Sequence, residues 1–334
     1  DRAGLTRIAA AAPPAGGVSG SGAAYLIDRR VNNAYRALNA ALAAGAKARW
    51  NGDRIAVSGI SRTAMGRIAA EYALSVTAGE ADEGQPVRRG RVAIYRPWGS
   101  NIDEGWTRWL LEQYGFAPAS VRNADVKAGL AGRYDTIILP DLPTRRRDAG
   151  ATGALLNGMG PDETPPPYAG GIGQEGAEKL KAFVEAGGTL VALNSASDAV
   201  IDLFDLPVTN VLKDLKSDQF FCSGALLQVA LAPGTAVSAG MPADPIVMFE
   251  RGPAFSTRAG FRGEVLASWP ADASPLRSGV LLHPEAIQGK AAALAIDYGK
   301  GRIFLYGFRP QWRGQSHGAY KLLFNTLYRT GDKN

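Results

Sequence analysis

Cysteine and histidine are nearly absent from this sequence of 334 residues. Cys222 is the only cysteine, so no internal disulfide can form, which suits the cytosol but also a periplasmic or secreted protein that relies on its core. The only histidines, His283 and His317, lie far apart, and neither has the ligand spacing typical of zinc sites, such as His-x-x-Glu. The sequence therefore predicts no metal site and no cofactor in this chain.

Long hydrophobic runs and a strong excess of one charge are also absent. No apolar stretch is long enough to span a bilayer, so we expect no membrane span. Lys and Arg exceed Asp and Glu by 37 to 31, and most of them are scattered. The one tight basic cluster, Arg145 to Arg147, fits a solvated loop better than the aromatic-lined basic stripe that nucleic-acid binding requires. We therefore expect a globular protein with two domains and no nucleic-acid partner.

The first part of the chain predicts a small α/β unit behind a linker. Residues 1–22 are rich in Ala, Gly, Pro and Ser, which is typical of a linker or irregular connection. Residues 23–85 then alternate short strands and helices. The expected strands are 23–27, 46–50 and 54–58, and the expected helices are 30–44 and 62–74, the second capped by Ser61. The polar stretch 79–89 is the predicted domain boundary.

Residues 90–330 show the pattern of a larger α/β domain. Strands are expected at 91–95, 121–124, 134–139 and 189–193, with helices starting at Asp103, Gly173 and Asp198. This alternation predicts a doubly wound, mostly parallel sheet, interrupted by a long Pro/Gly-rich excursion at 140–174. After Leu206 several closely spaced strands predict an antiparallel β-rich extension, ending in the strand 302–306 and a helix from Tyr320 to Tyr328.

Polar and aromatic side chains follow the predicted strands at their carboxyl ends, where open α/β sheets bind ligands. The candidate cleft residues are Arg96, Trp98, Asp141, Asn194, Ser195, Arg309, Gln311, Trp312 and Arg313. Two interpretations stay open. The residues form a ligand-binding cleft, or they satisfy loops, with Arg309 or Arg313 paired to Asp141 or Asp103. In either case we expect the loop 309–313 to lie beside the strand ends at 96–98 and 140–141.

Three segments give the chain a family resemblance: 91–109 (Val-Ala-Ile-Tyr-Arg-Pro-Trp onward), 170–194 (Gly-Gly-Ile-Gly-Gln-Glu-Gly onward) and 298–328. They resemble the C-terminal glutamine-amidotransferase-like domain (class I, flavodoxin-like) of large bacterial zinc carboxypeptidases of the carboxypeptidase A type. The resemblance implies a secreted or periplasmic protein whose zinc lies only in a parent peptidase domain. That peptidase domain or subunit is then the expected partner, together with a homo-oligomer. Because the chain starts at Asp1 rather than Met, we favour a fragment of a longer protein.

Class I amidotransferases use a Cys in a Gly-x-Cys-x-Gly elbow and a downstream His-Pro-Glu. This chain has Cys222-Ser223-Gly224 and, later, His283-Pro284-Glu285, which would supply a nucleophile, a base and an orienting carboxylate. The elbow should lie between a strand and a helix, and here that position is Asn194-Ser195, without a cysteine. We therefore expect no working triad, either of Cys222 or of Ser195 with His283 and Glu285.

Three functions remain open from the sequence. The leading hypothesis is a non-catalytic accessory or interaction module of a secreted zinc carboxypeptidase-like protein. The first alternative is a hydrolase or amidotransferase-like enzyme that works through the strand-end cleft. The second is a carbohydrate- or peptide-binding module that uses Trp98, Trp106 and Trp312.

Overall fold

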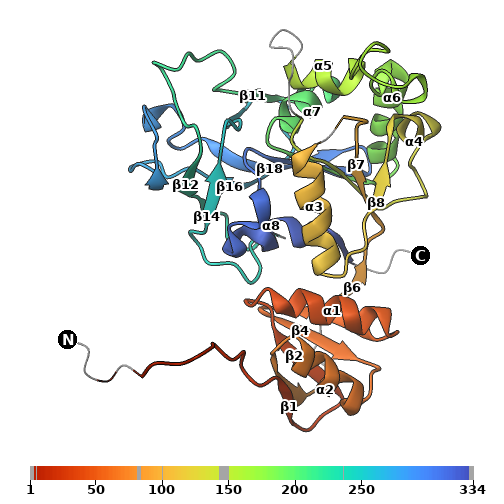
Figure 1. The fold of residues 1–334 in the computed structure, drawn as a ribbon, viewed down its shortest axis with the longest axis vertical. Helices are drawn as coiled ribbons and strands as arrows, with labels where there is room; N and C mark the ends of the chain where they lie inside the picture. Colours follow the sequence, from red (N-terminus) through yellow and green to blue (C-terminus); the bar gives the residue numbers. More distant parts are fainter. Residues whose placement is uncertain are drawn as a thin grey trace. The chain divides into compact units, whose positions relative to one another are not determined.

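The chain folds into two compact units, which divide between Arg88 and Arg89 (Figure 1). The computed structural model describes Gly4 and residues 6–80, 84–99, 101–142, 150–235 and 237–330. The first unit comprises Asp1–Arg88 and Thr330–Asn334, and the second comprises Arg89–Arg329. The basic cluster at 145–147 lies outside the described residues.

The first unit is built around a β-α-β-β-α-β core. Its elements are β1 (Gly17–Gly20), β2 (Ala24–Asp28), α1 (Asn33–Ala43), β3 (Lys47–Asn51), β4 (Arg54–Ser58), α2 (Arg62–Glu71), β5 (Ser75–Gly79) and β6 (Gln85–Arg89). The strands lie in the order β1-β5-β2-β4-β3-β6. The four central strands therefore have the ferredoxin-like arrangement, with β1 added beside β5 and β6 added beside β3.

Alternation of side chains explains why this sheet can bury one face. Tyr25, Ile27, Ile55 and Val57 are all buried, and each lies two residues from the next on its own strand. The buried stripe of α1, which includes Tyr35 and Leu38, belongs to the same core. The Ser61 hydroxyl accepts a hydrogen bond from the Ala64 amide, which confirms the cap predicted for α2.

The segment 1–22 differs from the expected linker because it contains a strand. β1 pairs in parallel with β5, from Gly17 opposite Ser75 to Gly20 opposite Ala78. Glycine also permits this segment to approach α2 closely, since a Cβ on Gly16 would lie 1.8 Å from the carbonyl oxygen of Ala69 in that helix. From the sequence alone, the Gly-rich composition indicates a flexible connection. In the structure, the glycines allow tight packing.

A parallel sheet of five strands forms the centre of the second unit. β7 (Val92–Tyr95), β8 (Ala119–Val121), β9 (Thr136–Leu139), β10 (Thr189–Leu193) and β19 (Gly301–Tyr306) lie in the order β8-β7-β9-β10-β19, and each pairs in parallel with its neighbour. Numbered along the chain, this is the flavodoxin-like order 2-1-3-4-5. The order reverses between β7 and β9, and at their carboxyl ends such folds usually bind ligands.

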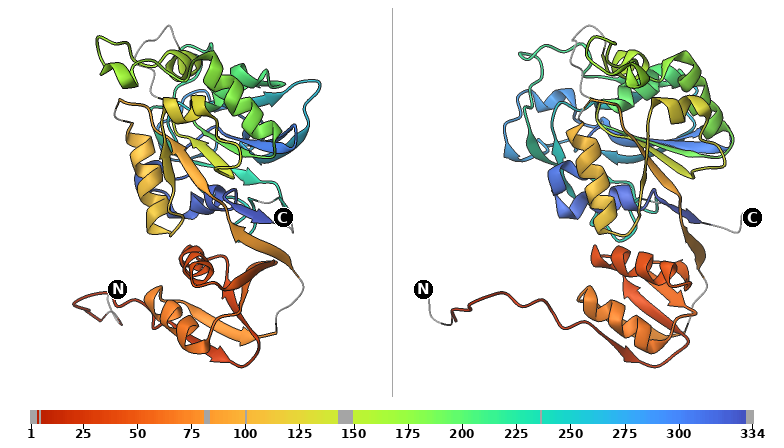
Figure 2. Two further views of the ribbon diagram at one scale, coloured as in Figure 1. Left: turned by 90° about the vertical axis from the view of Figure 1, so that its right-hand side faces the viewer. Right: turned by 45° about the vertical axis from the view of Figure 1, so that its right-hand side comes forward.

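Helices cover both faces of this sheet. They are α3 (Ile102–Gln113), α4 (Asn123–Ala128), α5 (Gly150–Asn157), α6 (Gly173–Glu185), α7 (Ala196–Phe204) and α8 (Tyr320–Phe324). Buried residues of α4 to α7, such as Val126, Leu180 and Val200, pack with Ile137 and Leu190 of the strands. The views of Figure 2 show these four helices on one side of the sheet and α3 with α8 on the other.

Antiparallel strands extend the sheet beyond β19. β18 (Ala291–Tyr298) forms a hairpin with β19, and β16 (Gly263–Ser268), β15 (Phe255–Thr257), β11 (Val208–Asn210) and β13 (Ala230–Leu231) continue from it. A separate three-stranded sheet has the order β14-β12-β17, with bounds Ile246–Phe249, Ala225–Gln228 and Leu276–Gly279. The α/β class, the mostly parallel sheet and the antiparallel extension predicted from the sequence are thereby confirmed.

The strand expected at 121–124 ends at Val121 in β8, and α4 begins at Asn123. Two further predicted segments need correction. The expected helix from Tyr320 to Tyr328 ends at Phe324, and Tyr328 begins the strand β20 (Tyr328–Thr330). The excursion at 140–174 is less irregular than expected, because it contains α5 and a short 3-10 helix at Pro166–Tyr168. In both cases, tertiary packing outweighs the local pattern.

Candidate functional site

A buried ionic cluster lies at the carboxyl edge of the parallel sheet in the second unit. The Arg309 guanidinium, 8% exposed, contacts three carboxylates from separate segments. Its Nη1 donates to Asp103 Oδ2 at 3.1 Å and to Asp141 Oδ2 at 3.4 Å, and its Nη2 donates to Glu250 Oε2 at 2.6 Å. The pairing of Arg309 with Asp103 and Asp141, anticipated as the loop-satisfying alternative, is therefore present.

The local sequence explains how these groups meet. Asp141 follows β9, Glu250 follows β14 and Arg309 follows β19, so three strand ends deliver their side chains to one place. Asp103 comes from the first turn of α3, whose start is fixed by Asn101, because Asn101 Oδ1 accepts from the amides of Asp103 and Glu104. Trp312 Nε1 also donates to Glu250 Oε2, at 3.1 Å, and joins the loop to the cluster.

Burial changes the ionisation of this cluster. It raises the pKa of Asp103 to about 6; the positive charge of Arg309 opposes the shift, while the negative charges of Asp141 and Glu250 add to it. One guanidinium faces three carboxylates, so a proton on Asp103 relieves part of the repulsion between them.

A strand-to-helix elbow connects β10 to α7 at Asn194 and Ser195. Asn194 adopts the left-handed conformation, with φ of 54°, which is the backbone geometry of a sharp elbow. Its side-chain amide donates to Asp141 Oδ1 at 2.9 Å. The Ser195 hydroxyl donates to the same oxygen at 2.6 Å, and the Ser195 backbone amide does so at 3.0 Å. The elbow is thus tied to the ionic cluster through Asp141.

Three polar atoms of this region are buried without a hydrogen-bond partner among the described residues. They are Asn194 Oδ1, Arg309 Nε and Gln311 Oε1. The other end of the Gln311 amide is engaged, since Nε2 donates to Thr107 Oγ1 of α3 at 2.7 Å. Buried polar atoms of this kind can bind an ordered water or a small polar ligand.

The alternative catalytic residues are not assembled into a triad. Cys222 is buried, its Sγ lies 3.7 Å from the Phe249 carbonyl oxygen, and burial raises the pKa of the thiol, whereas a nucleophilic cysteine needs a lowered pKa. His283 is half exposed, and its Nδ1 lies 3.0 Å from Glu285 Oε1. No contact in the described residues joins His283 to Cys222 or to Ser195, whose hydroxyl is bound to Asp141.

The remaining candidate residues lie outside the buried cluster. Arg96 is partly exposed and approaches Glu104 at 4.0 Å, and Arg313 is exposed with its guanidinium 4.8 Å from the Trp312 ring centre. Trp98 stacks on Tyr168 rather than contacting Trp312 within the described structure. The set predicted as one cleft is therefore divided: a buried cluster lies around Arg309, Arg313 lies at its exposed side beside Trp312, and Trp98 packs separately on Tyr168.

Three residues that contact the predicted ones were not predicted from the sequence: Glu250, Tyr168 and Arg122. Glu250 follows a strand, Ile246–Phe249, whose apolar run could have been recognised. Tyr168 lies in the excursion, and Arg122 lies just before a helix that the sequence did not reveal. No local signal connects these two positions with Trp98, because only the folding of the excursion brings them together.

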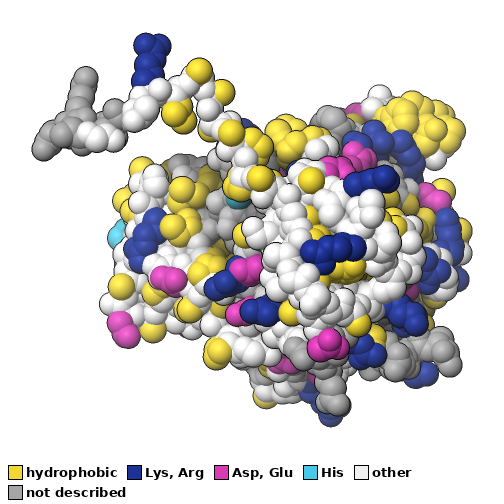
Figure 3. Space-filling model, turned by 90° about the horizontal axis from the view of Figure 1, so that it is seen from below, with side chains coloured by type: hydrophobic (Ala, Val, Ile, Leu, Met, Phe, Trp, Pro, Cys, Tyr) yellow, Lys and Arg dark blue, Asp and Glu magenta, His cyan; other side chains and the backbone are white. Residues whose placement is uncertain are grey.

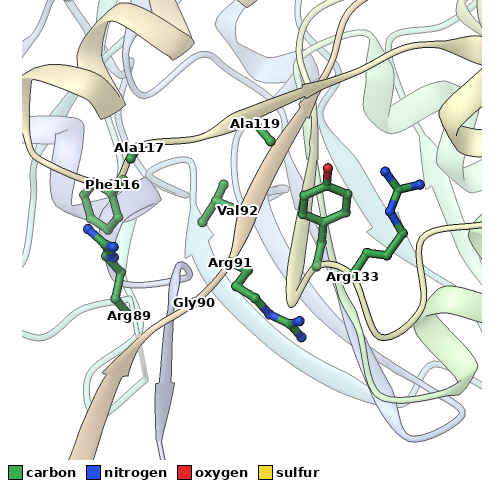
Figure 4. A pocket seen from close by; sticks show the side chains of 9 residues that line it. Arg89, Gly90, Arg91, Val92, Phe116, Ala117, Ala119 and Arg133 are labelled. Atoms are coloured by element: carbon green, nitrogen blue, oxygen red, sulfur yellow. The ribbon is translucent and has the colours of Figure 1, made fainter. Parts of the chain in front are cut away.

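A hollow of about 320 Å3 opens at the opposite edge of the sheet, near the amino ends of β7 and β8. Figure 4 shows Arg89 beside Phe116 on one side and Arg133 on the other, with Val92 and Ala119 between them. The guanidiniums do not converge, and Arg91 is held by Asp135 at 3.0 Å. This hollow therefore lacks the convergent charges of an anion site.

The described residues contain neither a metal-binding cluster nor a membrane-spanning helix. No group of three or more His, Cys, Asp or Glu side chains there could hold a metal ion. No helix in those parts of the chain combines the length and hydrophobicity needed to cross a bilayer. On the face shown in Figure 3, basic side chains are dispersed among acidic and uncharged ones.

Comparisons with known proteins give similarity of fold only. No protein-family model and no curated protein sequence matches the chain. A protein from Thermoplasma acidophilum described as a GMP synthase subunit is 12% identical with a TM-score of 0.43, over 72% of this chain and 93% of that one. PurLQS from Thermotoga maritima is 17% identical with a TM-score of 0.45, over 72% and 98%.

A β-galactosidase from Bacillus circulans is 12% identical with a TM-score of 0.41, over 71% of this chain but only 30% of that one. At these identities and TM-scores, the similarities do not bear on activity. The fold class rests on the strand order given above, and the carboxypeptidase context stays a prediction.

Proposed function

We propose that the second unit is a non-catalytic accessory module with an amidotransferase-like fold. The observation that carries this proposal is the elbow between β10 and α7, which holds Asn194 where a nucleophile would stand. An amide has no nucleophilic thiol or hydroxyl, and this one donates to Asp141. The elevated pKa of the Cys222 thiol supports the same conclusion.

The resemblance supplies the context of the proposal. The module would belong to a secreted or periplasmic zinc carboxypeptidase-like protein, whose peptidase domain carries the zinc and is the partner. A homo-oligomer is the further assembly that we propose. The carboxylate-rich cluster around Arg309 would then keep the carboxyl edge of the sheet rigid while other surfaces make the contacts.

Chemical labelling tests the non-catalytic part. The purified chain is incubated with 6-diazo-5-oxo-norleucine, which alkylates activated cysteines of glutamine-hydrolysing enzymes, and its mass is measured alongside glutaminase activity. We expect no adduct and no activity, both in the natural chain and in Cys222→Ser. An adduct on Cys222, together with glutaminase activity lost in Cys222→Ser, would favour the enzyme alternative.

The reading frame upstream of Asp1 tests the context. We expect it to continue into a segment that contains His-x-x-Glu and a distant His, the zinc ligands of carboxypeptidase A-type enzymes. In that longer protein, Cys222→Ser and His283→Ala should leave peptide cleavage within about threefold, since loss of a nucleophile costs orders of magnitude. A frame without such a segment would contradict the carboxypeptidase context but not the non-catalytic assignment.

A further inference from the structure

A stacked aromatic pair lies on the surface of the second unit. The ring centres of Trp98 and Tyr168 are 4.1 Å apart, and the ring planes differ by only 13°. Trp98 is 41% exposed and Tyr168 is 39% exposed, which is high for large aromatic side chains. Trp98 follows β7, and Tyr168 ends the 3-10 helix of the excursion, so two distant segments build one flat surface at the carboxyl edge of the sheet.

A guanidinium accompanies the stack. The Cζ atom of Arg122, the residue after β8, lies 5.6 Å from the Trp98 ring centre and 5.3 Å from that of Tyr168. These nearly equal distances place it beside the gap between the rings, since on an outer face it would lie roughly twice as far from one ring as from the other. The Arg122 guanidinium therefore does not cover the outer face of either ring.

The polar groups around the stack are available for hydrogen bonding. In the described part of the chain, the Arg122 guanidinium pairs with no carboxylate, and neither Trp98 Nε1 nor the Tyr168 hydroxyl makes a hydrogen bond. The backbone of Arg96 also lies near Arg122, because its amide donates to the carbonyl of Val121, but the Arg96 guanidinium faces Glu104 at 4.0 Å. The surface thus combines flat apolar faces, hydrogen-bond donors at the ring edges, and the guanidinium of Arg122, which has no carboxylate partner among the described residues.

We propose that Trp98, Tyr168 and Arg122 bind an acidic saccharide that contains uronic acid. A pyranose ring offers a C–H face that packs on an aromatic ring, hydroxyl groups that accept from Trp98 Nε1–H and the Tyr168 hydroxyl, and a carboxylate for Arg122. A neutral saccharide would offer the guanidinium only hydroxyl acceptors and no charge to pair with. A single-stranded nucleic acid also stacks on aromatics, but it needs a positively charged groove along its backbone, whereas among the described residues this patch offers one guanidinium without a carboxylate partner, that of Arg122.

This binding role goes beyond the accessory role proposed above, and either proposal can fail alone. The test uses the whole chain, with trigalacturonate as the acidic probe and trigalactose as its neutral match. Binding is followed by nuclear magnetic resonance of the indole N–H groups of the six tryptophans. We expect trigalacturonate to shift the Trp98 signal selectively, and added salt to weaken the binding.

Variants locate the site and its charge requirement. Trp98→Ala and Tyr168→Ala should each weaken trigalacturonate binding about tenfold or more, because each removes half of the stack. Arg122→Gln should weaken it about tenfold but change trigalactose binding less than about twofold. Trp109→Ala is the matched control, since Trp109 is also an exposed tryptophan, 45% exposed, on α3. Circular dichroism confirms that each variant is folded.

Four results would overturn the proposal. The first is no binding of trigalacturonate by the natural chain. The second is an equal loss of affinity in Trp98→Ala and Trp109→Ala. The third is equal affinity for trigalactose and trigalacturonate, with no effect of Arg122→Gln, which would show that binding does not depend on the carboxylate. Tighter binding of oligodeoxythymidylate than of trigalacturonate would assign the stack to nucleic acid instead.

Discussion

Arg309 compensates three carboxylates that would otherwise repel one another at the sheet edge. Its two terminal nitrogens are divided between Asp103, Asp141 and Glu250, and the fixed fork of the guanidinium holds donors toward all three carboxylates. Because the side chain is buried, little water is available to replace it. The stability of the second unit should therefore depend strongly on this single residue.

Replacing Arg309 by Met should destabilise the second unit by about 3–5 kcal/mol, since removing one partner leaves buried charges uncompensated. The measurement is urea-induced unfolding followed by tryptophan fluorescence. Arg302→Met is the matched control, because Arg302 also pairs with two carboxylates, Glu264 and Asp297, but lies nearer the surface. We expect that control to cost less than about 1 kcal/mol, and an equal effect of both variants would contradict the argument.

The raised pKa of Asp103 predicts a pH dependence of stability. Because the folded pKa of about 6 exceeds the ordinary value of 3.8, the folded chain binds the proton more tightly than the unfolded chain. The contribution of this group is therefore fully present at pH below about 4 and is lost as the pH rises through about 6.

The variant Asp103→Asn isolates this contribution. The free energy of unfolding of the natural chain, minus that of the variant, should fall by up to about 3 kcal/mol between pH 4 and pH 7. Asp198, whose pKa burial also raises to about 6, is common to both proteins and cancels in the difference. A difference that stays constant with pH would show that folding does not raise the pKa of Asp103.

At the scale of elements, the elbow between β10 and α7 combines a strained backbone with a fixed side chain. Positive φ is costly for most residues, and Asn tolerates it better than most. Gly252 packs against the elbow, since a Cβ there would lie 2.6 Å from Asn194 Oδ1. Both features explain why a small polar residue is suited to this turn.

Two substitutions at Asn194 separate these contributions. Asn194→Gly and Asn194→Ala both lose the hydrogen bond to Asp141, but only Ala must also adopt positive φ with a Cβ. We expect Ala to be less stable than Gly by about 1 kcal/mol in thermal or urea unfolding. If Ala is as stable as Gly, the elbow backbone is not strained.

The strands and helices with a strong local pattern could be predicted from the sequence. The strand Thr189–Leu193 has the predicted bounds, and Arg309 was correctly connected with Asp103 and Asp141 because polar residues at the ends of parallel strands meet at one edge. Elements without such a pattern were missed. α4 has only six residues, and β1 lies in a Gly-rich segment whose pairing with β5 depends on tertiary contacts.

The site was predictable only in part, for the same reason. The conformation of Asn194 follows from its place between a strand and a helix, which the sequence reveals. The stack of Trp98 on Tyr168 depends on how the excursion folds back, and no periodicity encodes that path.

At the scale of the whole molecule, the scarcity of metal ligands has a direct consequence. His283 pairs with Glu285, and His317 packs against the Tyr320 ring with ring centres 5.1 Å apart. We therefore expect the purified chain to hold less than one zinc per chain after dialysis, and to show no carboxypeptidase activity by itself. Elemental analysis by mass spectrometry decides this: one tightly held zinc, with chelator-sensitive peptide cleavage, would contradict the expectation.

The hydrogen bonds of the elbow also bear on how the protein ages. Asparagine deamidates when the backbone nitrogen of the next residue attacks the side-chain amide carbon. At Asn194 that nitrogen, on Ser195, donates to Asp141, and the amide is held by the same carboxylate. Asn157, by contrast, is exposed and precedes Gly158. During prolonged storage at neutral pH, peptide mapping should therefore find deamidation at Asn157 well before Asn194, and Asp141→Ala should narrow that interval.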